Sequence, residues 1–161
     1  MNHLWSPWRG AYVDQSDKPE GCIFCNALKE EDGPHNLIIT RSERGFVILN
    51  RFPYTSGHLM VVPKAHLPSL EDLDQPTTYE LADLSQTALR VLRRVYSPDG
   101  FNLGVNIGRA AGAGVADHVH IHIVPRWTGD ANFMTTLSET RVLPETLETT
   151  YEKVKTAWLA I

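Results

Sequence analysis

Five short apolar runs, each bounded by turn residues, predict about five β-strands in this chain. They cover residues 37–40, 46–50, 57–63, 101–108 and 118–126. A turn at residues 42–45 joins the first two runs, which is typical of a hairpin. The third run is rich in valine and is closed by Pro63.

Two longer segments place apolar side chains three or four residues apart, as amphipathic helices do. The first, residues 77–95, predicts one long central helix. Its apolar positions are Leu81, Leu84, Ala88, Val91, Leu92 and Val95. The second, residues 145–161, predicts a C-terminal helix. Its apolar positions are Leu147, Tyr151, Val154, Trp158 and Ile161. Hairpins combined with one crossing helix favour an α+β fold with an antiparallel sheet.

Length and composition indicate a single globular domain. The chain has 161 residues, of which 42% are hydrophobic, and no repeat or linker divides it. We expect one domain over residues 1–161, with a core at about 22–127, an N-terminal arm at 1–20 and a C-terminal extension at 128–161.

The net charge and the length of the apolar runs limit the kinds of partner that we expect for the chain. The formal net charge of −4 argues against nucleic acid or an anionic membrane as a partner, because no long basic stripe is present. No run approaches the roughly 20 apolar residues that a membrane span needs, and no signal-like segment begins the chain. A soluble cytoplasmic protein is therefore expected.

The most specific chemistry lies in the last predicted central strand. His118, His120 and His122 alternate there with β-branched residues. An extended strand sends alternate side chains to one face, so the three imidazoles should stand in a row. Because imidazole titrates near neutral pH, such a row offers a nucleophile, a proton donor and a metal ligand close together.

A glycine-rich loop at residues 106–115 directly precedes these histidines. Glycines let the backbone approach a ligand closely and turn its amides inward, and a ring of amides can hold phosphate oxygens. We therefore expect the loop to be a phosphate cradle.

The two cysteines, Cys22 and Cys25, are separated by two residues. Such a pair is compatible with a redox pair, a local disulfide or half of a zinc site. The polar, turn-rich segment at residues 14–21 disfavours a thioredoxin-like motif, which needs a buried strand before the pair.

Taken together, these segments resemble the histidine triad family of nucleotide hydrolases and transferases. Residues 118–124 fill the His-φ-His-φ-His-φ-φ signature, in which φ is apolar, and residues 57–63 match the upstream Gly-His segment. The glycine loop matches from Asn106. The segments at 5–9 and 125–133 resemble a bacterial branch described as diadenosine tetraphosphate phosphorylases.

The resemblance implies a two-step transfer of an adenylyl group from diadenosine tetraphosphate or a related adenine nucleotide. His120 would attack the α-phosphorus to form a covalent nucleotidyl-imidazole, and His122 would hydrogen-bond the phosphate or bridging oxygen. His58 would form a further polar wall of the pocket. Inorganic phosphate as acceptor would release ADP and ATP, whereas water would make the protein a hydrolase of dinucleoside polyphosphates or nucleoside phosphoramidates.

The resemblance also implies which residues bind the nucleotide. Asn50 would bind the ribose hydroxyls, and Ile23, Phe24 and Ile48 would line the base. The residues implied around the phosphates are Asn106, Gly112, Gly114 and Val115. Where several family members carry a serine or glutamine that assists the leaving group, this chain has Ala113 and Gly114.

Family members with this cysteine pair hold a structural zinc ion, which implies a ligand set of Cys22, Cys25, His66 and His118. A closed four-ligand site would brace the catalytic strand without performing the chemistry. No organic cofactor is implied. Resembling proteins join two sheets edge to edge, so a homodimer is expected.

Two other hypotheses stay open at this point. In the first, all three triad imidazoles hold a catalytic metal, although the histidine run at residues 118–124 contains no carboxylate base. In the second, the chain is a nucleotide-binding module that leaves its ligand intact. Chelation and prolonged incubation with nucleotide separate both from covalent catalysis.

Overall fold

The structure is a computed structural model that describes residues 21–130 and 144–161. The arm expected at residues 1–20 and the end of the 125–133 motif lie outside the described residues. Among the helices of these two ranges, none is long and apolar enough to cross a bilayer.

The predicted antiparallel sheet is confirmed, with five strands in the order β1-β2-β3-β5-β4. The strands are β1 (Ile38–Arg41), β2 (Gly45–Leu49), β3 (Leu59–Pro63), β4 (Gly100–Val105) and β5 (Ile121–Arg126). Strands β2 and β3 are fully buried and β1 is half-buried, whereas the outer strand β4 has no buried residue.

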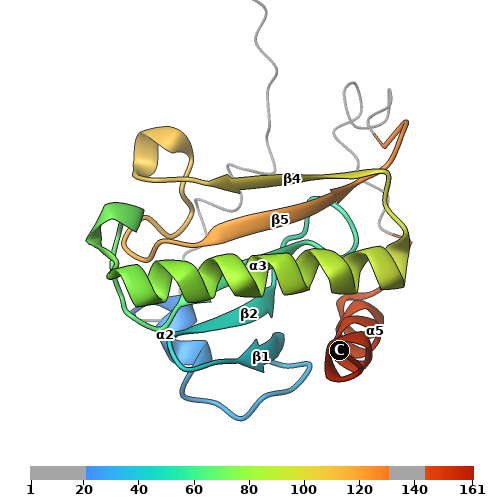
Figure 1. Cartoon of the computed structure of the whole chain (residues 1–161), viewed down its shortest axis with the longest axis horizontal. Coiled ribbons are helices and arrows are strands. Elements are labelled where there is room, and N and C mark those ends of the chain that lie inside the picture. The colour runs from blue at the N-terminus through green and yellow to red at the C-terminus, as the bar shows by residue number, and fades with distance from the viewer. Residues whose placement is uncertain (1–20, 131–143) are drawn as a thin grey trace, which may run out of the picture.

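One face of the sheet is covered by the predicted central helix, α3 (Gln75–Tyr96), as Figure 1 shows. Asp74 begins it by accepting a hydrogen bond from the backbone N–H of Thr77, and Ser97 ends it in the left-handed conformation. Buried Leu81 and Leu92 join the core cluster formed with the strands.

The C-terminal helix α5 (Leu147–Leu159) lies beside α3 at the β1 side of the sheet (Figure 1). Tyr151 and Val154 are buried as the periodicity predicts. Ile161, expected on the same face, is 60% exposed because the helix ends two residues before it. The remaining elements are the short helix α2 (Ile23–Ala27) and two 3₁₀ turns, η1 (Leu70–Asp72) and η2 (Arg109–Ala111).

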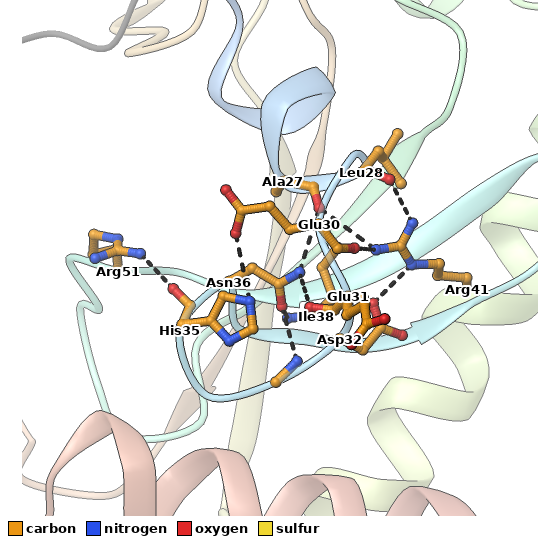
Figure 2. A network of polar contacts seen from close by, with 11 residues as sticks. Ala27, Leu28, Glu30, Glu31, Asp32, His35, Asn36, Ile38, Arg41 and Arg51 are labelled. Atoms are coloured by element: carbon orange, nitrogen blue, oxygen red, sulfur yellow. Dashed lines mark hydrogen bonds and ion pairs between the residues drawn. The ribbon is translucent and has the colours of Figure 1, made fainter.

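Helix α2 has only five residues, too few to be stable alone, so tertiary contacts must hold it. Arg41 of β1 supplies part of them (Figure 2). Its guanidinium donates to the carbonyls of Leu28 and Glu30, both at 2.7 Å, and pairs with Asp32 at 2.7 Å. The carbonyls at the end of α2 are thereby tied to the sheet.

Asn36 supplies the rest of the anchor and is itself buried. Its side-chain amide donates to the carbonyls of Ala27 and Glu31, and its oxygen accepts from the backbone N–H groups of Gly33 and Ile38. Such a buried amide with all its groups satisfied favours one conformation of the loop. The network fixes α2 against the start of β1.

Candidate active site and metal centre

The three triad histidines were expected within one strand, and the structure corrects this. Strand β5 begins only at Ile121, which pairs with Val61, so His122 lies in the sheet while His118 and His120 precede it. The ladder ends there because the backbone N–H of Val119 donates to the carbonyl of Leu67 at 2.7 Å instead. The rings of His120 and His122 nevertheless stay in contact, with their centroids 4.7 Å apart.

His120 has its protonation pattern set by the backbone. Its Nδ1 lies 2.9 Å from the carbonyl oxygen of His118, and only an N–H can occupy that contact. The neutral ring therefore keeps its lone pair at Nε2. Burial lowers the pKa of His120, so the ring is neutral at physiological pH. The Phe24 ring, 5.0 Å away, packs against it.

His122 has the opposite pattern, and the cause is a chain of hydrogen bonds through His58. The backbone N–H of Tyr54 donates to Nδ1 of His58 at 3.2 Å, so the proton of neutral His58 is on Nε2. That Nε2 lies 3.0 Å from Nδ1 of His122 and donates to it. The proton of His122 is then on Nε2, and burial together with nearby His120 lowers its pKa to about 4.

Asn50 supports the same assignment. Its amide nitrogen lies 3.4 Å from Nδ1 of His58 and can only donate there, while its oxygen accepts the backbone N–H of Phe52 at 2.9 Å. The residue expected to bind ribose thus also orders the loop between β2 and β3. His58, expected as a pocket wall, is fully buried behind His122.

Two neighbouring imidazoles therefore present different groups at Nε2. His120 offers a lone pair, and His122 offers an N–H. A lone pair beside a hydrogen-bond donor is the arrangement needed to attack a phosphorus atom while stabilising the oxygen that leaves it.

The residues expected around the base lie on two elements beside His120. Ile23 on α2 is 43% exposed and available to a ligand, whereas Phe24 and Ile48 are 1% and 7% exposed. Ile48 lies opposite Met60, which lies opposite His122, so all three side chains share one face of the sheet. This face is the one turned away from α3, because Gly45, which shares the opposite face of β2 with Leu49, packs against Leu81 and Leu84 of α3.

The glycine loop contains the 3₁₀ turn η2, which the sequence did not predict. Gly108 and Gly112 have φ values of 76° and 81°, which favour glycine. The N–H groups of Gly112 and Ala113 are bonded to carbonyls inside the loop. In the described part of the chain, no backbone carbonyl accepts the N–H of Gly114 or Val115. Asn106 lies at the start of the loop, half-buried.

The four residues predicted as metal ligands come together. The Sγ atom of Cys22 lies 3.2 Å from Nδ1 of His118, and Sγ of Cys25 lies 3.4 Å from Nδ1 of His66. All four ligand atoms lie within 4.8 Å of one another. Cys22 caps α2 and Cys25 lies inside it, so the anchored helix positions both thiols, which are not bonded to each other.

This donor set fits a tetrahedral Zn²⁺ ion, whose bond lengths place sulfur and nitrogen ligands about 3.3–3.8 Å apart. The orientation of His118 agrees. Its Nε2 donates to the carbonyl of Pro63 at 2.8 Å, which leaves Nδ1 as the atom with a lone pair for a metal. The Phe24 ring belongs to the hydrophobic core and contacts both His118 and His120.

Sequence reasoning missed three residues that shape the site. Asn36 and Arg41 hold α2, and Tyr54 supplies the N–H that sets the His58 tautomer. Only Tyr54 carried a signal, as an aromatic residue four positions before His58.

Comparison with known proteins gives a consistent set of similarities. Residues 33–129 match the HIT domain family. The AP-4-A phosphorylase of Mycobacterium tuberculosis is 38% identical over 168 residues, which cover 98% of this chain and 85% of that protein. A Zn-bound histidine triad family protein from Mycobacterium smegmatis has a TM-score of 0.68 at 30% identity, with coverage of 87% of this chain and 94% of that one. A histidine triad nucleotide-binding protein from Sulfolobus tokodaii has a TM-score of 0.70 at 29% identity, with coverage of 86% and 93%.

Proposed function

The chain belongs to the HIT domain family, and from this premise we propose that it is a nucleotidyltransferase that cleaves diadenosine tetraphosphate or a related adenine nucleotide at the α-phosphate. The observation that carries the proposal is the set of contacts from which we infer opposite tautomers, with Nδ1 of His120 at the His118 carbonyl and Nδ1 of His122 at Nε2 of His58. The similarity to an AP-4-A phosphorylase over nearly the whole chain supports the same substrate class.

In the first step, Nε2 of His120 attacks the α-phosphorus, and the bond from phosphorus to the bridging oxygen breaks. The Nε2–H of His122 donates to the departing oxygen, so ATP leaves and AMP stays bonded to His120. In the second step, inorganic phosphate attacks the same phosphorus, ADP leaves and the imidazole is restored. The reaction converts diadenosine tetraphosphate and phosphate into ATP and ADP.

The nucleotide would bind on the sheet face that carries Ile48 and His122. The adenine would contact Ile23 beside the rigid wall of Phe24 and Ile48, with the ribose at Asn50. The phosphates would lie under the glycine loop, at the amides of Gly114 and Val115 and near Asn106 and Gly112.

We propose Zn²⁺ as the ion of the four-ligand cluster, where it would hold α2 to the segment before β5. Its role is structural, because two thiolates and two imidazoles complete a tetrahedral shell. The proposed homodimer would cover the edge of β4, where Leu103 is 48% exposed. Light scattering of the wild type and of Leu103→Lys tests that edge.

The central test is incubation with diadenosine tetraphosphate, with and without phosphate, followed by separation of the products. ADP and ATP that form only with phosphate support phosphorolysis, whereas AMP and ATP indicate that water is the acceptor. A quenched reaction of the wild type should carry AMP on the peptide that contains His120. Turnover by His120→Asn at the wild-type rate would refute the nucleophile.

A further inference from the structure

Gly104 lies inside the outer strand β4, where the fold itself does not require a glycine. Its backbone does not have a positive φ, and its pairing with β5 keeps a regular register on both sides, so neither a turn nor a bulge explains it. A Cβ added there would meet no atom of the described residues within 4 Å. Because glycine weakens the interior of a strand, its presence favours a close approach by a ligand or another backbone.

The register of the sheet places Gly104 beside the imidazole that donates to the leaving oxygen. Gly104 lies directly opposite His122. On the other side of His122, Met60 of β3 and then Ile48 of β2 continue the same row. Directly paired residues share one face, which here is the pocket face turned away from α3. Neighbouring strands lie about 4.8 Å apart, so the row leads from the base wall past His122 to Gly104, which is exposed.

This row has the same direction as the substrate in the proposed reaction. The adenosine that stays on the protein is placed at Ile48, on the β2 side of His122. The leaving phosphates accept from His122 and lie under the glycine loop, which begins at Asn106, two residues after Gly104. The polyphosphate of the leaving group therefore crosses the pocket face of β4 at Gly104.

The side chains beside Gly104 leave this part of β4 uncovered. Asn102 is the next residue on the same face, and its side-chain oxygen accepts from Nη1 of Arg126 at 2.6 Å. Since Arg126 lies opposite Gly100, Asn102 is drawn towards the other end of the strand. Leu103 projects from the opposite face. Pairing of a second copy along the edge of β4 would use backbone groups in the plane of the sheet, which requires no glycine at position 104.

We propose that Gly104 is a specificity-determining residue, whose missing side chain leaves room beside His122 for the polyphosphate of the leaving nucleotide. This inference rests on the proposed function and specifies its substrate class. A ligand that ends at the α-phosphate, such as AMP, does not reach β4, whereas a dinucleoside polyphosphate does. Gly104 takes no part in bond cleavage, which is left to the two histidines.

The experiment adds a side chain at this position and compares two ligands. Gly104→Val should lower kcat/KM for diadenosine tetraphosphate about tenfold, equivalent to about 1.4 kcal/mol, and Gly104→Ala should lower it by a smaller factor. Binding is measured by calorimetry in a His120→Asn background, which lacks the nucleophile. There, Gly104→Val should raise the Kd for diadenosine tetraphosphate about tenfold and change the Kd for AMP by less than about twofold.

Gly100→Val is the matched control on the same strand and the same face. The backbone of Gly100 does not have a positive φ either, and an added Cβ would likewise meet no described atom within 4 Å. Gly100 pairs with Arg126 instead of His122, so the variant should bind both ligands as the wild type does. Because valine favours strands, neither valine variant should have a lower Tm. Light scattering should give the wild-type mass for both.

Wild-type affinity for diadenosine tetraphosphate in Gly104→Val would overturn the proposal. So would an equal loss of AMP binding, which would mean that the added side chain displaces His122. A loss accompanied by a changed mass would assign the glycine to a contact between copies instead.

Failure of the proposed function has a different signature. If the wild type leaves diadenosine tetraphosphate intact but Gly104→Val weakens its binding selectively, the reaction is refuted and the role of Gly104 in selectivity stands. If the wild type binds neither nucleotide, both proposals are wrong.

Discussion

Replacement of His58 tests the hydrogen-bond chain that sets the protonation of His122. His58→Phe keeps a ring of similar volume but removes the donor to Nδ1 of His122 and the acceptor for the Tyr54 N–H. A buried polar group without its partner costs about 1–3 kcal/mol, so the free energy of unfolding should fall by about 2–4 kcal/mol. One hydrogen bond of about 1.5 kcal/mol no longer favours the His122 Nε2–H tautomer, so kcat should fall about tenfold.

His58→Gln is the matched control, since its amide N–H can reach the position of the imidazole Nε2 and donate to His122. It should recover part of the lost kcat. Two-dimensional ¹H–¹⁵N NMR of the imidazole nitrogens measures the tautomers directly. We expect the proton on Nδ1 of His120 and on Nε2 of His58 and His122. A His122 protonated at Nδ1 in the wild type, or equal kcat values for the two variants, would refute this reasoning.

Three further perturbations test other parts of the molecule. Arg41→Ala removes the donors that hold the end of α2, and urea denaturation should show a loss of about 1–3 kcal/mol. Metal analysis should find about one Zn²⁺ per wild-type chain. The Cys22→Ser variant should lose the ion, and its main effect should be a lower Tm, with a smaller effect on kcat. Burial lowers the pKa of His122 from 6.5 to about 4, so the unfolded chain binds this proton at higher pH than the folded chain does. The free energy of unfolding should therefore decrease as pH falls from about 6.5 towards 4, and urea denaturation should show a shallower decrease in His122→Asn.

Local patterns were sufficient for most of the fold. Apolar runs located the strands, and helical spacing located α3 and α5, because both depend on which side chains one element buries. The start of β5 could not be predicted this way. It depends on the Leu67 carbonyl, which takes the N–H of Val119 out of the ladder although β3 continues to Pro63. Likewise, α2 is held by Asn36 and Arg41, which come from later in the chain.

The spacing of the histidines located the site but could not assign a task to each ring. An imidazole can carry its proton on either nitrogen, and the choice depends on the atom that faces the other one. In His118, Nε2 donates to the Pro63 carbonyl, so Nδ1 points to the thiols. In His120, Nδ1 donates to the His118 carbonyl, so Nε2 carries the lone pair. In His122, Nδ1 accepts a hydrogen bond from His58, so Nε2 carries the N–H.

The partners of the three rings are the Pro63 carbonyl, the His118 carbonyl and the His58 ring. The first two are backbone groups, and His58 is remote in the sequence, so no side-chain pattern reveals them. The consequence is that changes outside the triad should exchange or blur its three roles. A variant at position 58 that accepts a hydrogen bond from His122, where His58 donates one, should weaken the stabilisation of the leaving group. The metal cluster should stay intact, because His118 has a separate partner in the Pro63 carbonyl. Conversely, loss of the cluster should loosen the segment before β5 and reach His120 through the His118 carbonyl, which orients it. The two effects are separable by metal content, which only the second should change.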